Sequence, residues 1–299
     1  GYKSAITANA AMDIAAAKDI VRMYIDMEAG LKEKGYKDRV KEAKLLDEQL
    51  PEYQFDKSGA IREWSMKEYK ENNAHRHISH LYCAWPSYQT QHDDILSDAC
   101  RQAIVNRNRE NTGKDDTASH GWIHKALVEA RLKNSESVYD ILNLLVHSDI
   151  FYTSLFTDHN TNRAKGVACT DTLFGIAGIV NEMLVYSDRS TIELFPALSS
   201  RIPKGKVCGL MTRAGVRIDS LEWCINTCTE GLKTDMKDGF YIKLKITALR
   251  DTEFGLILKN ENFNEMSKED KSLFNQNIKL KSGEEYAIPV SYTHLTLPT

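Results

Sequence analysis

The sequence lacks the marks of a membrane-spanning protein and of a nucleic-acid-binding protein. No apolar run approaches the roughly 20 residues that a transmembrane helix needs. No stripe of Lys and Arg stands clear of interleaved acids, and the formal net charge is −3. A partner bound chiefly through its phosphates, such as nucleic acid, is therefore not expected. No signal peptide opens the chain, but it starts at Gly1 without a methionine, so localisation and oligomeric state stay open.

Cysteine and glycine motifs are scarce as well. Six cysteines in 299 residues are too few for a disulfide scaffold, so free buried thiols are expected. Cys224 and Cys228 would share one strand face, but no nearby histidine completes a zinc set, and packing is the better interpretation. The small residues of DTLFGIAG lack the GxGxxG spacing of a phosphate-binding turn and favour close helix packing.

The first part of the chain has a helical pattern. MDIAAAKDIVRMYIDMEAGL contains no proline and places its apolar residues on one stripe, namely Met12, Ala16, Ile20, Met23 and Met27. Further helical stretches follow with short polar connections, which is typical of antiparallel hairpins. Ser119 and Ser135 are expected to cap two of these helices.

After Ser187 the pattern changes to strands. TIELFPAL, KVCGLMTRAGVRIDSLEW, GFYIKLKITAL, EFGLILK and NIKLK are β-type runs separated by turn residues. IKLKI alternates, so that strand should be half buried. Helices followed by strands predict a helical domain over residues 1–190 and a β-domain over residues 191–289. Residues 290–299, VSYTHLTLPT, match the translation of a sequencing adapter, and we interpret them as an artefact.

HRHISH at residues 75–80 is the densest cluster of candidate ligands. As metal ligands, His75 and His77 would share one face of a strand, but His80 would fall on the other face. No carboxylate or cysteine nearby supplies a further ligand. As sugar-binding groups, Arg76 and His77 offer donors to hydroxyls. His80 favours packing against the following helix.

Other positions leave two interpretations open. Trp122 suits either stacking on a pyranose or the core of a helical domain. His120 and His124 have the spacing of a metal pair but lack the Glu of HExxH. Asp158 and His159 lie on an irregular segment and would either line a cleft or cap a turn.

Four stretches resemble, in order, glycoside hydrolase family 95, the inverting α-L-fucosidases and their α-L-galactosidase relatives. They are AHRHISHLY at 74–82, SHGWIHKALVEARL at 119–132, CTDTLFGIAGIVNEML at 169–184, and IELFPALS with VCGLMTRAGVRIDSLEW within 192–223. GAIREW is also similar to a family stretch, but its acid, Glu63, receives no chemical role and is expected to brace the fold or lie at the surface.

The resemblance implies a catalytic α/α six-fold toroid of helical hairpins, of which this chain holds the later part, followed by an antiparallel β-sandwich-like domain. It places the general acid and two water-orienting asparagines upstream, so residues 1–289 alone should be inactive. Half a toroid would also leave apolar helix faces uncovered. The implied protein is periplasmic, surface-bound or secreted, acts on an oligosaccharide or glycan, and needs no metal or organic cofactor.

The resemblance assigns the general base to Asp171. The family stretch FQIDGNFG supplies this carboxylate, and CTDTLFG at 169–175 matches its Asp, Phe and Gly as Asp171, Phe174 and Gly175. This chain departs from the stretch at Cys169, Thr170, Thr172 and Leu173. From spacing alone, Asp171 would instead be only the N-cap of the helix that follows.

These observations predict a fragment of a glycoside hydrolase that removes terminal α-L-fucosyl or α-L-galactosyl residues with inversion. Asp171 would deprotonate the attacking water. The sugar would be bound by His75, Arg76, His77 and Trp122. One alternative is a non-catalytic carbohydrate-binding homologue of the same scaffold. Another is a metal-dependent hydrolase that uses His75 and His77.

Overall fold

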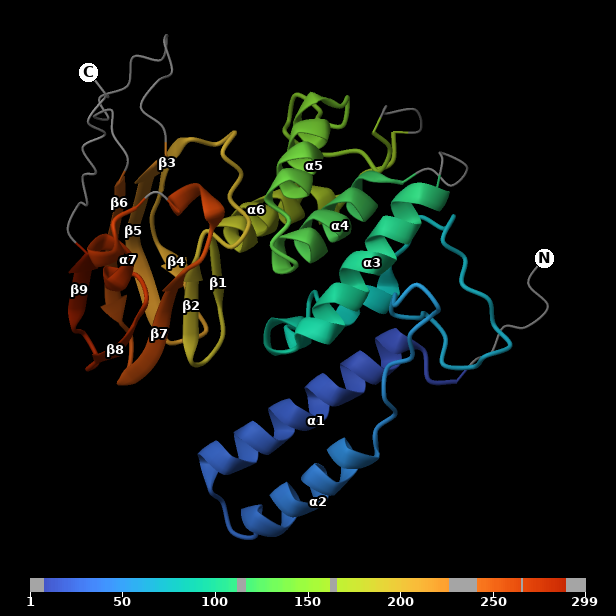
Figure 1. Ribbon diagram of the computed structural model, residues 1–299, viewed down its shortest axis with the longest axis horizontal. Coiled ribbons are helices and arrows are strands. Elements are labelled where there is room, and N and C mark those ends of the chain that lie inside the picture. Colours follow the sequence, from blue (N-terminus) through green and yellow to red (C-terminus); the bar gives the residue numbers. More distant parts are fainter. Residues whose placement is uncertain (1–7, 112–116, 162–165, 226–240, 265, 289–299) are drawn as a thin grey trace. The chain divides into compact units, whose positions relative to one another are not determined.

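The computed structural model describes residues 8–111, 117–161, 166–225, 241–264 and 266–288. The chain forms two compact units (Figure 1). The first comprises Gly1–Leu132 and Ser148–Gly175, and the second comprises Lys133–His147 and Ile176–Thr299. The predicted order of helices followed by strands is confirmed. The predicted domain boundary between residues 190 and 191 stays a prediction, and residues 290–299 lie outside the described part of the chain.

Helices form most of the first unit. They are α1 (Ala11–Leu31), α2 (Tyr36–Gln49), the 3₁₀ helices η1 (Ser79–Cys83) and η2 (Gln89–His92), α3 (Asp94–Glu110) and α4 (Ser119–Arg131). Helices α1 and α2 pair as the predicted antiparallel hairpin (Figure 1). Arg39 Nη2 of α2 lies 2.6 Å from Glu28 Oε2 of α1 and fastens the two helices together. Among the described residues, no helix is long and apolar enough to cross a membrane.

Helix α1 packs through small residues rather than through the predicted apolar stripe. Ala11 and Ala15 are buried and share a core with Leu81 and Cys83 of η1. Alanine side chains let the two backbones approach closely. The stripe instead faces outward, because Met12, Ile20, Met23 and Met27 are exposed. The expectation of uncovered apolar helix faces is thus confirmed for α1.

The cysteines are reduced where the structure describes them. Cys83 and Cys100 are buried between η1 and α3 with their sulfur atoms 3.5 Å apart. Cys169 and Cys224 are also buried. Buried thiols are therefore confirmed, although Cys208 is exposed. Cys228 lies outside the described residues, so the predicted pairing of Cys224 and Cys228 on one strand face stays a prediction.

The second unit contains two sheets. One has the order β1-β2-β7-β8 and the other β3-β5-β6-β9, with β4 paired to β5. Among the described residues, all strand pairs are antiparallel except β2 with β7. The strands are β1 (Val185–Ser187), β2 (Thr191–Leu194), β3 (Lys204–Val207), β4 (Leu210–Met211), β5 (Val216–Cys224), β6 (Tyr241–Ala248), β7 (Thr252–Leu258), β8 (Gln276–Leu280) and β9 (Glu285–Ile288).

Three aromatic rings join the core of this second unit. Phe195, which follows β2, stacks on Phe263 of the 3₁₀ helix η3 (Glu261–Phe263) at 5.2 Å and meets Trp223 of β5 edge-on at 5.4 Å. Gly205 pairs with Trp223, and a Cβ at that glycine would come within 2.4 Å of the indole. In β6, Ile242, Leu244 and Ile246 are buried, which confirms the predicted alternation.

Three further helices complete the fold. They are α5 (Ser135–His147), α6 (Thr170–Leu184) and the short α7 (Lys268–Leu273). Asn134, rather than the predicted Ser135, caps α5, because its Oδ1 accepts the Ser137 N–H at 3.3 Å. Ser135 is the first residue inside the helix. Helix α6 begins in the first unit and continues into the second, so its first turn belongs with the candidate site.

Candidate active site

The HRHISH segment is held in place from α3. Arg107 of α3 donates from Nη1 to the carbonyl of His75 at 3.0 Å and from Nη2 to Glu63 Oε2 at 3.0 Å. Arg107 is buried and Glu63 is partly buried. Arg107 also donates to the carbonyl of Asn72, so it fixes the backbone on the approach to the histidines. The expectation that Glu63 braces the fold is confirmed.

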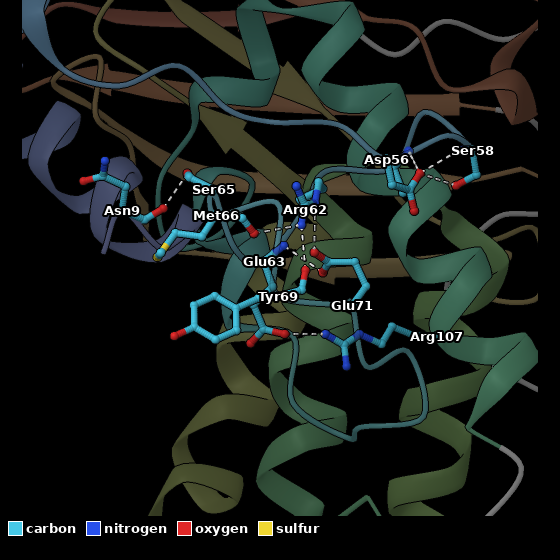
Figure 2. A network of polar contacts seen from close by, with 11 residues as sticks. Asn9, Asp56, Ser58, Arg62, Glu63, Ser65, Met66, Tyr69, Glu71 and Arg107 are labelled. Atoms are coloured by element: carbon cyan, nitrogen blue, oxygen red, sulfur yellow. Dashed lines mark hydrogen bonds and ion pairs between the residues drawn. The ribbon is translucent and has the colours of Figure 1, made fainter. Parts of the chain in front are cut away.

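A second, partly buried ion pair orders the loop before these histidines (Figure 2). Arg62 Nε lies 3.2 Å from Glu71 Oε1, and the other oxygen of Glu71 accepts the Glu63 N–H at 2.9 Å. Arg62 Nη2 also donates to the carbonyls of Tyr69 at 2.7 Å and Met66 at 3.2 Å. These bonds to charged groups specify one loop conformation, because leaving any member unpaired in a buried site is costly.

His80 is a packing residue, as the sequence predicts. It lies in η1 and is 2% exposed. Burial lowers the pKa of His80 to about 3, and the positive charge of Arg107 adds to that effect. The ring is therefore neutral at ordinary pH.

Four other histidines form a row of ring contacts. His75 and His77 have ring centroids 4.9 Å apart, His77 and His120 of α4 are 6.0 Å apart, and His120 and His159 are 4.9 Å apart. Arg76 Nε donates to His77 Nε2 at 3.4 Å. Among the described residues, no three side chains of His, Cys, Asp or Glu form a group that would hold a metal ion.

Asp158 anchors the segment that carries His159. Its Oδ1 accepts the Asn160 N–H at 2.7 Å and its Oδ2 accepts the Tyr152 hydroxyl at 2.6 Å. The Tyr152 hydroxyl and then the Asn160 N–H hold the pKa of Asp158 below its usual value. Of the two interpretations for Asp158, the turn cap is confirmed. His159 instead reaches the ring of His120.

Ser119 ties three segments together instead of capping a helix. Helix α4 begins at Ser119 itself, and the residue before it is Ala118. The Ser119 hydroxyl donates to the carbonyl of Asp158 at 2.7 Å and lies 2.7 Å from Thr172 Oγ1. All three groups are buried. The predicted N-cap role of Ser119 is wrong, because the hydroxyl bonds to neighbouring segments.

Asp171 lies inside the first turn of α6, which begins at Thr170. The side chain is exposed, and the Cys169 thiol makes a weak contact with its Oδ2 at 3.9 Å. The turn packs tightly on α4, because a Cβ at Gly175 would come within 2.3 Å of Ile123. Close helix packing is thus confirmed for this glycine, and it sets the position of the Asp171 backbone.

The charge of Asp171 reaches the histidine row. Burial lowers the pKa of His120, and His159 lowers it further, whereas the Asp171 carboxylate raises it. Arg76 also lowers this pKa. His120 of α4 therefore lies within electrostatic reach of both the predicted base and a predicted sugar-binding residue.

A pocket of about 300 Å³ lies between α3, α4 and the HRHISH segment. Of the predicted sugar-binding residues, His75, Arg76 and Trp122 line it. Trp122 is half-buried and so belongs to the pocket wall rather than to the core. His77 and Asp171 are not among the described lining residues. His77 contacts the ring of His120, and Asp171 acts on His120 through its charge. The other lining residues are Ile78, Ile104, Arg107, Asn108, Asn111, Thr117, Gly121 and Lys125.

Sequence reasoning missed the contributions of Lys125 and Asn108. Lys125 Nζ lies over the Trp122 ring, 5.2 Å from its centroid, and bonds to Asn108 Oδ1 of α3. The spacing of Trp122 and Lys125, three residues apart on a helix, places both on one face and was the available signal. No comparable signal exists for Asn108, because its position depends on the packing of α3 against α4.

Comparison with known proteins identifies similar sequences. A sequence model of the Glycosyl hydrolase family 95 catalytic domain matches residues 1–184. Alpha-L-fucosidase 2 of Arabidopsis thaliana is 30% identical over 238 residues, covering 75% of this chain and 26% of the relative. Probable alpha-fucosidase A of Aspergillus oryzae is 29% identical over 178 residues, covering 54% and 25%. The chain thus spans about a quarter of the length of these relatives.

Proposed function

Because the chain belongs to glycosyl hydrolase family 95, we propose that it is part of an enzyme that hydrolyses terminal α-L-fucosyl residues of oligosaccharides with inversion. The names of the relatives from Arabidopsis thaliana and Aspergillus oryzae support a fucoside. An α-L-galactoside is the second substrate to test. The observation that carries the proposal is the convergence of His75, Arg76 and Trp122 on one pocket beside His120, whose pKa responds to Asp171.

In this proposal Asp171 is the general base. An inverting glycosidase needs a carboxylate that removes a proton from water on the face of the sugar opposite the leaving group. Asp171 is exposed and so accessible to water, and the first turn of a helix favours a negative charge. The general acid is assigned to none of the described residues. Its carboxyl group would lie roughly 6.5–9.5 Å from the base, with the water between them.

The remaining predicted residues would hold the sugar. Arg76 and His75 line the pocket with hydrogen-bond donors, and Trp122 offers an aromatic face to the apolar side of a pyranose. His77 contacts the rings of both His75 and His120, so it would connect the pocket to the side on which Asp171 lies. The Arg107–Glu63 pair keeps this edge in one conformation before the substrate arrives.

The test is proton NMR of a 2′-fucosylated oligosaccharide incubated with the longer protein that contains this chain, with the wild type and Asp171→Asn compared. We expect β-L-fucose to appear first, and only with the wild type. Release of α-L-fucose first would contradict inversion, and unchanged release by the variant would contradict the assignment of the base.

Two further results of the same experiment separate the alternatives. Residues 1–299 alone are expected to release no fucose, because the acid is not assigned to them. Asp171-dependent release by this chain would show that the acid lies within it. Saturable sugar binding by the longer protein without any release would favour the carbohydrate-binding homologue. This alternative is considered because the chain departs from the family stretch beside Asp171, at Thr172 and Leu173.

A further inference from the structure

The pocket wall carries cations without acids. Arg76, Arg107 and Lys125 line it together with His75, and none of its described lining residues is an Asp or a Glu. Arg107 has its own counterion, because Glu63 lies 3.0 Å away. Lys125 is therefore the cation on this wall at which an incoming anion is best tested.

Lys125 is a half-buried ammonium with neutral neighbours. Its Nζ bonds to the side-chain oxygen of Asn108 and faces the ring of Trp122. Among the described residues, no carboxylate forms an ion pair with it. Burial lowers the pKa of Lys125, and the Glu129 carboxylate one turn along α4 counteracts this only in part.

A cation in this position is stabilised by an anion that enters the pocket. Removing an ammonium group from water is unfavourable unless it is paired and hydrogen-bonded. Trp122, beside it, presents an aromatic face of the kind that stacks on pyranose rings, and Asn108 offers an amide. The volume of about 300 Å³ lies at the small end of ligand pockets and suits a single sugar unit.

We propose that this pocket binds an anionic sugar unit, a pyranose that carries a carboxylate or a sulfate group, with the anionic group at Lys125 Nζ and the ring against Trp122. The inference deepens the proposed function and rests on it, since the anionic unit would be the neighbour of the fucosyl residue in the glycan, and the fucosyl residue itself would lie beside His77 and His120, towards Asp171. Arg76, on the same wall, supplies a planar guanidinium that matches the two oxygens of such a group.

The first test measures binding of four probes to the 299-residue chain by ligand-observed NMR at low salt. The probes are methyl glucuronide, methyl glucoside, glucose 6-sulfate and inorganic sulfate. We expect at least one of the charged sugars to bind about tenfold or more tightly than methyl glucoside, the effect of one hydrogen bond to a charged group. This preference should fall as salt is added. A preference for one charged sugar over the other identifies the group as carboxylate or sulfate.

The second test replaces the cation. Lys125→Met removes the charge and keeps the chain length, Lys125→Arg keeps the charge, and Lys44→Met makes the same change at an exposed site on α2. The preference for charged sugars should be lost only in Lys125→Met. Circular dichroism checks that each variant folds. If Lys125→Met does not fold, the inference is tested by three other results. These are the preference of the wild type for charged sugars, the salt dependence of that preference, and the preference of Lys125→Arg.

Three results would overturn the inference: equal binding of charged and neutral sugars by the wild type, a preference that survives in Lys125→Met, or inorganic sulfate binding as tightly as glucose 6-sulfate. The readout is independent of hydrolysis. If the charged sugars bind but no fucoside is cleaved by the longer protein, the proposed function fails and the pocket assignment stands. If the longer protein has an Asp171-dependent activity but the pocket shows no preference for charged sugars, the proposed function stands and the pocket assignment fails.

Discussion

The two units of the chain differ in what they bury. The core of the strand-rich unit is joined by aromatic rings, Phe195, Phe263 and Trp223. Among the described residues, the helical unit buries more ionic and polar side chains, including Arg107 and Asp158, than the strand-rich unit, which buries Asp188 and Glu193. Buried polar groups lower stability unless every partner is in place. Their concentration around the loops that carry His75 and His159 marks the region that is built for a site.

The cavities of the two units lead to the same conclusion. The second unit has a larger cavity, about 620 Å³, than the pocket of about 300 Å³ in the first. Its described wall contains one arginine, Arg213, and one acid, Glu182, but neither a histidine nor an aromatic ring. Volume alone therefore does not identify the site. The convergence of an aromatic ring, cations and His75 on the smaller pocket makes that pocket the candidate site.

The largest expected difference between the units is catalytic. In the longer protein, Asp171→Asn should lower the rate of fucose release by about 10²- to 10⁴-fold, the contribution of a general base. Asp140→Asn, at an exposed carboxylate on α5, should leave the rate unchanged. Initial rates measured by NMR or a coupled assay check this. If the two variants lost the same fraction of the rate of fucose release, the assignment of the catalytic base to Asp171 would be contradicted.

A second comparison concerns ion pairs. Arg107→Met leaves the partly buried Glu63 without its partner and should lower the free energy of unfolding by about 3–5 kcal/mol. Arg201→Met breaks an exposed pair with Asp140 in the second unit and should cost about 0–1 kcal/mol. Urea denaturation measures both. A small loss for Arg107→Met would show that the buried network does not hold the helical unit together.

A third comparison uses two glycines that face bulky neighbours. Gly175→Ala would press on Ile123 of α4, and Gly205→Ala would press on Trp223 of β5. Each should lower the free energy of unfolding by about 1–3 kcal/mol, because overpacking forces a local shift. Only Gly175→Ala should also shift the NMR signals of the His120 ring, since it displaces the first turn of α6. A shift caused by Gly205→Ala would contradict this separation.

The smallest effect, taken per pH unit, is in the pH dependence of stability. Because the pKa of folded His80 is about 3, below the value of 6.5 for an unperturbed ring, the unfolded chain binds a proton that the folded chain does not. Stability is full above pH 6.5 and should decrease by about 1 kcal/mol per pH unit as the pH falls toward 3. His80→Gln should flatten this slope. His147→Gln, at an exposed position on α5, should leave it unchanged, and equal slopes in wild type and His80→Gln would contradict the account.

The sequence was sufficient for features that repeat or that follow a motif. The order of helices and strands, the alternation in IKLKI and the buried His80 all follow from patterns of two or more neighbouring residues. The contribution of His75, Arg76 and Trp122 to one pocket followed from resemblance rather than from spacing. Whether these residues bind sugar stays a prediction.

Features that depend on long-range packing could not be predicted from the sequence. The apolar stripe of α1 is visible in the sequence, but the contact of its alanines with η1 is not. Ser119 has the composition of an N-cap, yet its hydroxyl bonds to Asp158 and Thr172, which are distant in the sequence. The role of Arg107 likewise depends on Glu63 and His75, more than thirty residues away.

The most direct test of the central claim, that Asp171 and the predicted sugar-binding residues form one site in the helical unit, is an NMR titration of the histidine-labelled chain with L-fucose. The account predicts saturable shifts for the rings of His75, His77 and His120, none for His147, and a changed response of His120 in Asp171→Asn. The absence of saturable shifts, or equal shifts at His147, would contradict it.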